Sequence, residues 1–280
     1  MILSIASGKG GTGKTTIAVN LALSLMDTHS IQFLDCDVEE PNAHFFLKPC
    51  ILQKQPVYLP IPDIIEAKCT YCGKCAEVCA YNALAVLKDN VLVFPELCHG
   101  CGGCRLLCPE QAIKEKGQRI GIIESGSANR IFFLHGKLDI GQALSPPLIR
   151  AVKKQIDSEN TVIIDAPPGT SCPMVESVKK SDFCILVTEP TPFGLNDLRL
   201  AAETVKKLKT PIGVIVNRAG IGDNQVQSYC QNKSIPVLMS IPMDRRIAVA
   251  YSEGKSIIDT QPSYKKKFLE LFDNIQKGKK

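Results

Sequence analysis

Short apolar runs and segments with helical spacing alternate along most of the chain. The run Ile2–Ala6 ends at Ser-Gly, and apolar residues then recur with a helical period through Lys14–Met26. Five further apolar runs have the length of buried strands, and helical patterns separate most of them. These runs are 31–34, 161–164, 183–187, 212–216 and 237–241, and the helical patterns are 146–156, 195–208 and 224–231. Strands alternating with helices predict an α/β fold, in which a mostly parallel sheet is covered by helices on both faces.

The stretch between residues 60 and 116 interrupts this alternation. It is rich in Cys and Gly and holds only brief apolar pieces, at Leu84–Leu87 and Val91–Phe94. A further candidate strand, Arg119–Ile123, follows it. We therefore predict two domains, a sheet domain made of residues 1–59 and 117–280 and a small inserted α+β module made of residues 60–116.

Composition places the chain among ordinary globular proteins, with one exception. Its 280 residues are 45% apolar and 22% charged, and the formal net charge is +5. No apolar run approaches the about 20 residues that cross a bilayer, and the first residues lack the pattern of a signal peptide, so we expect a cytoplasmic protein. The mild charge gives no reason to expect nucleic-acid binding. The exception is the thirteen cysteines, which without an export signal favour metal or cluster binding over disulfides.

The residues after the first apolar run form a candidate phosphate loop. Gly8–Thr15 fits the pattern GxxxxGK followed by Thr, and it stands between a predicted strand and a predicted helix. Glycines let backbone N–H groups converge on phosphate oxygens, Lys14 bridges the terminal phosphates, and Thr15 offers its hydroxyl to Mg²⁺. The alternative, a glycine-rich turn with two surface lysines, fits this context less well. The candidate nucleotide-binding residues here are Gly8, Lys9, Gly10, Gly11, Thr12, Gly13, Lys14, Thr15 and Thr16.

Eight of the thirteen cysteines form two runs with the same spacing, 29 residues apart. In a CxxCxxCxxxC run, typical of bacterial ferredoxins, three cysteines hold one iron–sulfur cluster and the fourth ligates the other cluster. Zinc, the alternative, favours two CxxC pairs joined by a longer loop and has no use for the third cysteine. We predict two 4Fe–4S clusters, the first held by Cys69, Cys72, Cys75 and Cys108, and the second by Cys98, Cys101, Cys104 and Cys79.

Other residues near these runs need no part in ligation. Ala80 stands where the ferredoxin pattern has a proline, such as the one that follows Cys108, and His99 is not required because four cysteines serve each cluster. We expect four of the scattered cysteines to be small buried hydrophobic residues, with a redox role left open for one of them, Cys172. These four are Cys36, Cys172, Cys184 and Cys230.

The second lysine of the phosphate loop adds a family resemblance. The sequence KGGTGKT, from Lys9 to Thr15, resembles the deviant Walker A motif of the MinD, ParA and nitrogenase iron-protein class of ATPases. The resemblance implies that Lys9 reaches the nucleotide of a partner subunit and stabilises the transferring phosphoryl group there, while Lys14 acts in its own subunit. It also implies a dimer, either of identical chains or with a paralogous ATPase, and ATP or ADP with Mg²⁺ as cofactors.

This resemblance extends over nearly all of the chain outside the insertion. The sequence DCD ending at Asp37 resembles the family's switch I, whose second aspartate orients the attacking water or contacts Mg²⁺. The sequence DAPPG beginning at Asp165 resembles Walker B running into switch II, so Asp165 is expected to hold Mg²⁺ through water; the alternative is a carboxylate at a strand end. Asn217, Arg218 and Pro242 lie where the family places adenine contacts, although a strand-end Asn is also a common turn residue.

Three functions are consistent with these motifs. The first, which we favour, is an ATP-hydrolysing dimeric switch coupled to two clusters, for electron transfer or for an unidentified redox or iron–sulfur partner protein. The second is a cluster carrier or assembly factor, but carriers of the Mrp type use a CxxC pair near the C-terminal part and none occurs after Cys104. The third is spatial organisation, as in MinD: the tail Tyr264–Lys280 has an apolar face flanked by lysines, which suits a membrane surface, yet we favour a helix packed on the domain.

Overall fold

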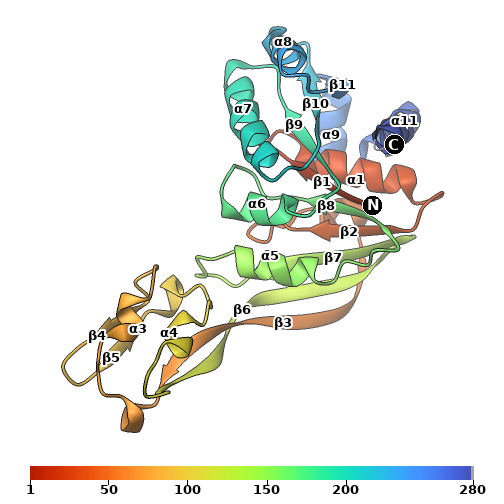
Figure 1. Ribbon diagram of the computed structural model, residues 1–280. Coiled ribbons are helices and arrows are strands. Elements are labelled where there is room, and N and C mark those ends of the chain that lie inside the picture. Colours follow the sequence, from red (N-terminus) through yellow and green to blue (C-terminus); the bar gives the residue numbers. More distant parts are fainter. Residues whose placement is uncertain (279–280) are drawn as a thin grey trace.

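The computed structural model describes residues 1–278, which form one large sheet domain and a small module at its side (Figure 1). The sheet has nine strands in the order β11-β10-β9-β1-β8-β2-β7-β6-β3. The strands from β11 to β7 are parallel, and β6 and β3 are antiparallel additions at one edge. The strand bounds are β1 Ile2–Ala6, β2 Ile31–Asp35, β3 Cys50–Ile64, β6 Ile113–Ala128, β7 Ile131–Leu138, β8 Thr161–Asp165, β9 Phe183–Thr188, β10 Ile212–Ala219 and β11 Val237–Pro242.

Helices cover both faces of the parallel part, which confirms the fold class predicted from the sequence. In β8, Ile163 packs into the cluster beneath α1 and α11, while Val162 and Ile164 face the opposite cluster beneath α5. A strand buried on both faces reads as a continuous apolar run, which is why the sequence pattern locates these strands. The helices are α1 Lys14–Leu25, α2 His44–Leu47, α5 Pro146–Lys153, α6 Cys172–Val178, α7 Pro192–Lys207, α8 Gln225–Asn232, α9 Arg245–Ser252, α10 Ile257–Thr260 and α11 Ser263–Lys277.

The C-terminal helix α11 packs on the sheet domain. Its apolar face, which includes Phe268 and Phe272 at 0% exposure, lies in the same buried cluster as α1 residues such as Leu21. This packing uses the residues that a membrane-surface helix would insert into lipid. Within residues 1–278, no helix has the length and apolar character that crossing a bilayer requires.

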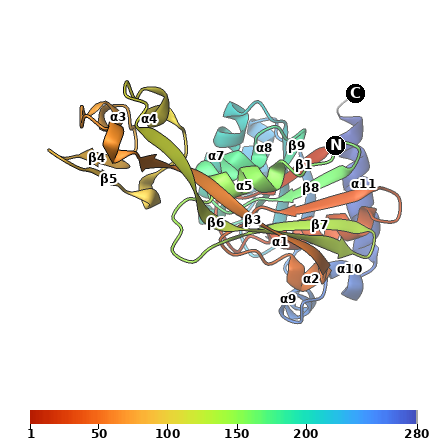
Figure 2. The same ribbon diagram turned by 90° about the horizontal axis from the view of Figure 1, so that it is seen from below.

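Strands β3 and β6 form a long antiparallel ribbon that carries the module away from the sheet (Figures 1 and 2). Val57 pairs with Gly121, which pairs in turn with Leu138 at the end of β7, so the rest of the ribbon extends beyond the C-terminal ends of the parallel strands. The sequence predicted a strand only at residues 119–123. That prediction was too short, because the ribbon has solvent on both faces over much of its length and β3 contains three prolines, which an edge strand tolerates.

A buried carboxylate joins the three strands at the base of this ribbon. Glu124 of β6 contacts Lys54 of β3 at 2.7 Å, Lys137 of β7 at 3.0 Å and His135 Nε2 of β7 at 2.8 Å. Burial alone would raise the pKa of Glu124, but these three partners outweigh it and hold the pKa at about 2. Burial also lowers the pKa of His135.

The module between the two ribbon strands repeats itself with the 29-residue offset of its cysteines. The left-handed residues recur in step, with Tyr71, Gly73 and Asn82 followed 29 positions later by Gly100, Gly102 and Gln111. The two halves are linked by the small hairpin of β4 and β5. The module's elements are η1 Glu66–Lys68, α3 Lys74–Glu77, β4 Leu84–Val86, β5 Val91–Val93, η2 Pro95–Leu97 and α4 Gly103–Leu106. The domain boundaries predicted at residues 60 and 116 fall within the ribbon itself.

Candidate functional site: a nucleotide edge and two cysteine sites

The loop between β1 and α1 depends on glycine for its conformation. Gly11 and Gly13 have φ values of 76° and 96°, in the left-handed region that other residues adopt at a cost. A Cβ atom on Gly13 would also lie 2.5 Å from Nδ2 of Asn217, which donates to the Thr12 carbonyl at 2.8 Å. Helix α1 begins at Lys14 with no side-chain cap, so its first backbone N–H groups are left to bind a ligand.

A cavity of about 410 Å³ lies over this loop, between the segment after β2 and helix α9. Its volume is within the range of small-molecule sites. Ten of the predicted residues line it: Gly10, Gly11, Gly13, Lys14, Thr15, Thr16, Asp37, Asn217, Arg218 and Pro242. Three predicted residues of the loop, Gly8, Lys9 and Thr12, lie outside this lining. A Cβ on Gly8 would clash with the Asp197 backbone, so Gly8 serves packing of the loop against α7.

Several lining residues were missed by the sequence analysis. They are Glu40, Asn42, Pro168, Ile247, Ala248 and Tyr251. The last three belong to α9, a short helix that was not predicted and that carries no motif. Tyr251 also contacts Phe46 of α2 with ring centroids 5.0 Å apart, so the wall of the cavity joins α9 to the segment after β2.

The amide of Asn217 is engaged within the chain on both sides. Besides the bond from Nδ2 to the Thr12 carbonyl, Oδ1 accepts from the Arg218 backbone N–H at 3.0 Å. One N–H of the amide is left to face the cavity, because an amide nitrogen carries two donors. Asn217 therefore holds the phosphate loop in place, and only one of its amide N–H groups is left to donate to an adenine base.

Two aspartates at neighbouring strand ends are buried in different ways. Asp35 and Asp165 are paired in register across β2 and β8, and both are 0% exposed. The Asp35 carboxylate accepts three backbone N–H groups, from Asp37 at 3.1 Å, Asn42 at 3.1 Å and Ala43 at 3.0 Å. The two carboxylate oxygens of Asp165 have no hydrogen-bond partner among the described residues. Asp35 therefore shapes the segment after β2, whereas Asp165 is left to act on a ligand.

Burial sets the protonation of these carboxylates. It raises the pKa of Asp165 to about 7, with the nearby Thr15 hydroxyl and then the charge of Lys14 opposing the rise. It also raises the pKa of Asp37 to about 6, again against the charge of Lys14, and raises that of Asp35 well above its ordinary value. Buried carboxylates without partners are costly in a protein that binds nothing, and an arriving cation removes that cost.

The chemistry of this donor set fits Mg²⁺ held largely through water. Within residues 1–278, no three His, Cys, Asp or Glu side chains converge closely enough to enclose a metal ion. Mg²⁺ keeps several waters and takes only one or two protein ligands when a phosphate is present. The Thr15 hydroxyl and the unpartnered Asp165 carboxylate are such groups, and Asp37 lines the same cavity.

Lys9 is held by an acidic residue of its own chain. Its ammonium lies 3.4 Å from Oε2 of Glu189, a buried carboxylate whose other oxygen contacts Arg218. Glu189 follows β9 directly, and Lys9 is about one-third exposed. In the single chain Lys9 thus points to the end of β9, outside the lining of the nucleotide cavity.

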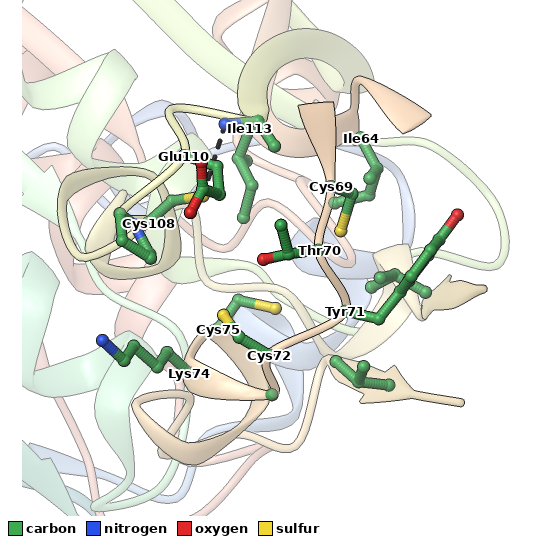
Figure 3. Close-up of a pocket in the computed structure, with 15 residues that line it drawn as sticks. Ile64, Cys69, Thr70, Tyr71, Cys72, Lys74, Cys75, Cys108, Glu110 and Ile113 are labelled. Carbon is green, nitrogen blue, oxygen red and sulfur yellow. Dashed lines mark hydrogen bonds between the residues drawn. The ribbon is translucent and has the colours of Figure 1, made fainter. Parts of the chain in front are cut away.

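The eight cysteines of the module line two separate cavities, and within residues 1–278 no three of them converge closely enough to enclose a metal ion in the single chain. Cys69, Cys72, Cys75 and Cys108, here called the first cysteine site, line one cavity together with Ile64 and Ile113 at the end of the ribbon (Figure 3). Cys79, Cys98, Cys101 and Cys104, the second cysteine site, line the other cavity together with Pro60, Pro62 and Glu115 of the ribbon. These are the two sets into which the sequence spacing divided the cysteines.

Backbone donors and the thiols themselves suit an electron-rich metal cluster. The Ala83 N–H lies 3.3 Å from Cys79 Sγ, and the Ala112 N–H, 29 residues later, lies 3.3 Å from Cys108 Sγ. Burial raises the thiol pKa of Cys75, Cys98 and Cys104, so thiolates there require a cationic group beside them. Figure 3 shows the cysteines of the first site around a common space, with Tyr71 extending away from it.

The remaining cysteines fall into two groups. Cys36, Cys184 and Cys230 are buried, as expected for small hydrophobic residues. Cys50 and Cys172 are exposed, so the expectation that Cys172 is buried was wrong. Cys172 is the first residue of α6 and follows the DAPPG turn, where the chain has just left the sheet edge.

The parallel sheet, the glycine loop and the carboxylates at neighbouring strand ends define a P-loop nucleotide-binding protein of the α/β class. The chain belongs to the CobQ/CobB/MinD/ParA nucleotide-binding family, whose profile matches residues 3–257. The solved structure of the septum site-determining protein MinD from Pyrococcus horikoshii, complexed with Mg-ADP, has a TM-score of 0.62 at 20% identity and covers 98% of this chain and 95% of that one. That likeness supports the fold.

Curated relatives match over most of their length. Uncharacterized protein MJ0579 of Methanocaldococcus jannaschii is 32% identical over 92% of this chain and 91% of its own. A cytosolic Fe-S cluster assembly factor, the NUBP2 homolog of Nematostella vectensis, is 25% identical over 92% of this chain and 85% of its own. The iron-sulfur cluster carrier protein of Pyrococcus horikoshii is 25% identical over 98% of this chain and 84% of its own.

Proposed function

We propose that this protein is an ATP-hydrolysing, nucleotide-dependent dimeric switch that holds two 4Fe–4S clusters and works in electron transfer or with an iron–sulfur partner protein. The observation that carries the proposal is the placement of both sets of four cysteines in a module carried by a ribbon that leaves the nucleotide-binding edge of the same chain. The cytosolic name of one relative supports a cytosolic location.

On the nucleotide side, each residue has a role that its position supports. Lys14 and the N–H groups at the start of α1 bind the phosphates, and Thr15 and Asp165 hold Mg²⁺, which neutralises charge on the phosphates when bound. Asp37 accepts a proton from, or orients, the attacking water at the wall of the cavity. Asn217 keeps the loop in the binding conformation through its bond to the Thr12 carbonyl.

Dimerisation would complete the site by supplying a cation. Lys9 lies outside its own chain's cavity and is partly exposed, held by Glu189. Lys9 can leave this pair without leaving Glu189 unpaired, because the Glu189 carboxylate keeps its contact with Arg218, so Lys9 is free to contact a phosphate of a second subunit. There its charge would stabilise the transferring phosphoryl group.

On the cysteine side, the thiolates of each site would hold one cluster, which supplies one-electron redox chemistry when bound. The bonds from Ala83 and Ala112 to sulfur stabilise negative charge on the ligands. Four cysteines at each site leave no open coordination position, which suits resident clusters better than clusters in transit.

Anaerobic purification followed by iron and sulfide analysis, with electron paramagnetic resonance in the presence and absence of Mg-ATP, tests this proposal. We expect about eight irons and eight sulfides per chain, as two 4Fe–4S clusters require. Tetrahedral Zn–thiolate content in place of iron and sulfide would overturn the cluster assignment. Equal dimer fractions with and without Mg-ATP, measured by light scattering, would overturn the switch.

A cluster carrier is the second candidate, and the names of the relatives favour it. The discriminating measurement is cluster transfer from this protein to an apo-ferredoxin in a buffer that contains a chelator. Quantitative transfer with emptying of either cysteine site would make the protein a carrier. Retention of both clusters through repeated ATP turnover supports the switch.

Spatial organisation on membranes receives no support from the tail, since its apolar face is buried against α1. Co-sedimentation with anionic liposomes that requires both ATP and residues 264–280 would restore that function.

A further inference from the structure

The two cysteine sites lie at different depths along the ribbon. The second site is lined by Pro60, Pro62 and Glu115, and the first by Ile64 and Ile113, which pair with each other at the ribbon's end. Ile64 is two to four residues further out than the two prolines, or about 7–13 Å at about 3.3 Å per residue. The second site is therefore the one nearer to the nucleotide edge.

Only the second site shares the buried core of the sheet domain. Cys98, at 8% exposure, belongs with Leu59 and Ile120 of the ribbon to a buried apolar cluster, and Cys79 packs against that cluster. The same cluster contains Val38, the residue after Asp37. No cysteine of the first site belongs to any buried apolar cluster in the part of the chain that the structure describes.

Close contacts fix the ribbon to the second site. A Cβ on Gly100, between Cys98 and Cys101, would lie 2.7 Å from Leu59 Cδ1, so the ligand loop rests directly on that side chain. Arg105 of α4 pairs with Glu115 of β6 at 3.3 Å. The next glycine of the second site, Gly102, has the ribbon's Glu115 carboxylate 3.2 Å from its Cβ position, whereas its equivalent in the first site, Gly73, has only the Glu77 carboxylate at 4.0 Å, from its own helix.

The other end of the ribbon rests on the segment that follows Asp37. The Leu138 N–H donates to the Val38 carbonyl at 2.9 Å, and the Asp139 N–H donates to the Ile120 carbonyl at 3.0 Å. A Cβ on Gly136 would lie 2.7 Å from Val38 Cγ1, so this segment is tightly packed on β7. A movement at Asp37 is thus passed to β7 and, through Ile120, to the ribbon interior, because packed side chains have little room to absorb it.

We propose that the nucleotide state acts selectively on the second cysteine site, through the apolar interior of the ribbon, and leaves the first site unchanged. This inference rests on the proposed function, since it takes for granted a nucleotide at Asp37 and clusters at the cysteines. It adds an asymmetry that the sequence repeat alone does not contain. The two runs have identical cysteine spacing, yet only one is built into the domain that binds the nucleotide.

Redox titration of the anaerobically purified protein, followed by electron paramagnetic resonance, tests the asymmetry. The matched variants Cys72→Ser and Cys101→Ser assign the signals, because these two cysteines are related by the repeat, are both exposed and belong to different sites. We expect Mg-ATP to shift the midpoint potential of the second site and not that of the first. An equal shift at both sites, or a shift at the first site alone, would overturn the inference while the proposed switch stands.

Hydrogen exchange of the same protein gives a readout that does not depend on the cluster signals. The amides of Ala83 and Ala112 are matched, each donating to a cysteine sulfur at 3.3 Å in a different site. Mg-ATP is expected to change the exchange rate at Ala83 and not at Ala112. No change at either amide and no shift of either potential, with full iron and sulfide content, would overturn the inference and the coupling together.

Two substitutions test the route. Leu59→Ala removes the contact with Gly100 and should abolish the shift in midpoint potential at the second site. Glu115→Gln, which weakens the pair with Arg105, should reduce that shift, and it serves as the test if Leu59→Ala does not fold. Tyr58→Ala is the control, because Tyr58 is the neighbouring residue of β3 but is 57% exposed. A full shift in Leu59→Ala and Glu115→Gln would exclude the ribbon interior as the route.

Discussion

Replacing Asp165 by Asn is expected to stabilise the protein in the absence of nucleotide. Both Asp165 oxygens are buried without a hydrogen-bond partner among the described residues, and burial raises the pKa of this carboxyl from 3.8 to about 7. At about 1.36 kcal/mol per pKa unit, holding the charged form in the folded state costs about 4 kcal/mol near neutral pH. An unpartnered amide costs about 2 kcal/mol in the same place, so Asp165→Asn gains about 2 kcal/mol.

The pH dependence has a definite sign. Because the folded-state pKa of Asp165 lies above the unfolded value, the penalty is absent below about pH 3.8, grows as pH rises toward 7 and is constant above it. The advantage of Asp165→Asn should therefore widen between pH 5 and about pH 8. Calorimetry in EDTA should show a rise in Tm of about 4–8 °C at pH 8, as expected for a domain of this size.

Asp35→Asn is the matched control. Asp35 pairs in register with Asp165 and is equally buried, but its oxygens accept three backbone N–H groups. An Asn side chain presents an NH₂ group to one of these donors, which costs about 1–3 kcal/mol. Because burial raises the pKa of Asp35 as well, removing its charge works against that cost, so the change in Tm should be less favourable for Asp35→Asn than for Asp165→Asn.

Binding of Mg-ADP should make Asp165→Asn less stable than the unsubstituted protein, the reverse of their order without ligand. Mg-ADP at a hundred times its dissociation constant should stabilise the unsubstituted protein by about 2.7 kcal/mol, and the variant should lose most of that gain. A variant that is less stable than the unsubstituted protein in EDTA, or that keeps the full response to Mg-ADP, would refute the assignment of Asp165 as a carboxylate left bare for Mg²⁺.

Three further predictions follow from other parts of the structure. Glu124→Gln should lower the free energy of unfolding by about 2–3 kcal/mol at pH 7, and the difference should shrink as pH falls from 4.5 toward 2, because the folded-state pKa of Glu124 is depressed to about 2; urea unfolding across this range checks it. Lys9→Ala should keep nucleotide binding within about threefold, measured by calorimetric titration, yet slow phosphate release by about 10³-fold; unchanged release would remove Lys9 from the reaction. Phe268→Ala should cost about 3–5 kcal/mol of stability, and liposome binding that falls in step with it would instead favour the membrane function.

Features that depend on neighbours in the chain were available from the sequence. The phosphate loop is a local structure, because the glycines, Lys14 and Thr15 act within one turn between a strand and a helix. The strands of the parallel part other than β7 were found for a related reason: burial on both faces leaves an unbroken apolar run. The first three cysteines of each run also follow from spacing, because a tight loop brings them to one cavity, and the ferredoxin pattern assigns the fourth to the other set.

Features that depend on distant segments were not available. The ribbon has no apolar run to mark it, because much of it faces solvent and its pairing with β7 is set by the sheet. Asp35 and Asp165 both follow apolar runs, and only the folded chain brings the amides of Asn42 and Ala43 to one of them and none to the other. Cys172 is exposed because the DAPPG turn carries it away from the sheet.

The sequence by itself therefore determined the chemistry of this protein, a phosphate loop and two sets of four cysteines, because that chemistry depends on short spacings along the chain. The tertiary structure decided how those parts relate. It set the edge from which the ribbon leaves, the site that joins the buried core through Cys98 and Leu59, and the carboxylate that stays without a partner. Such relations arise from packing between residues far apart in the sequence, and no local pattern encodes them.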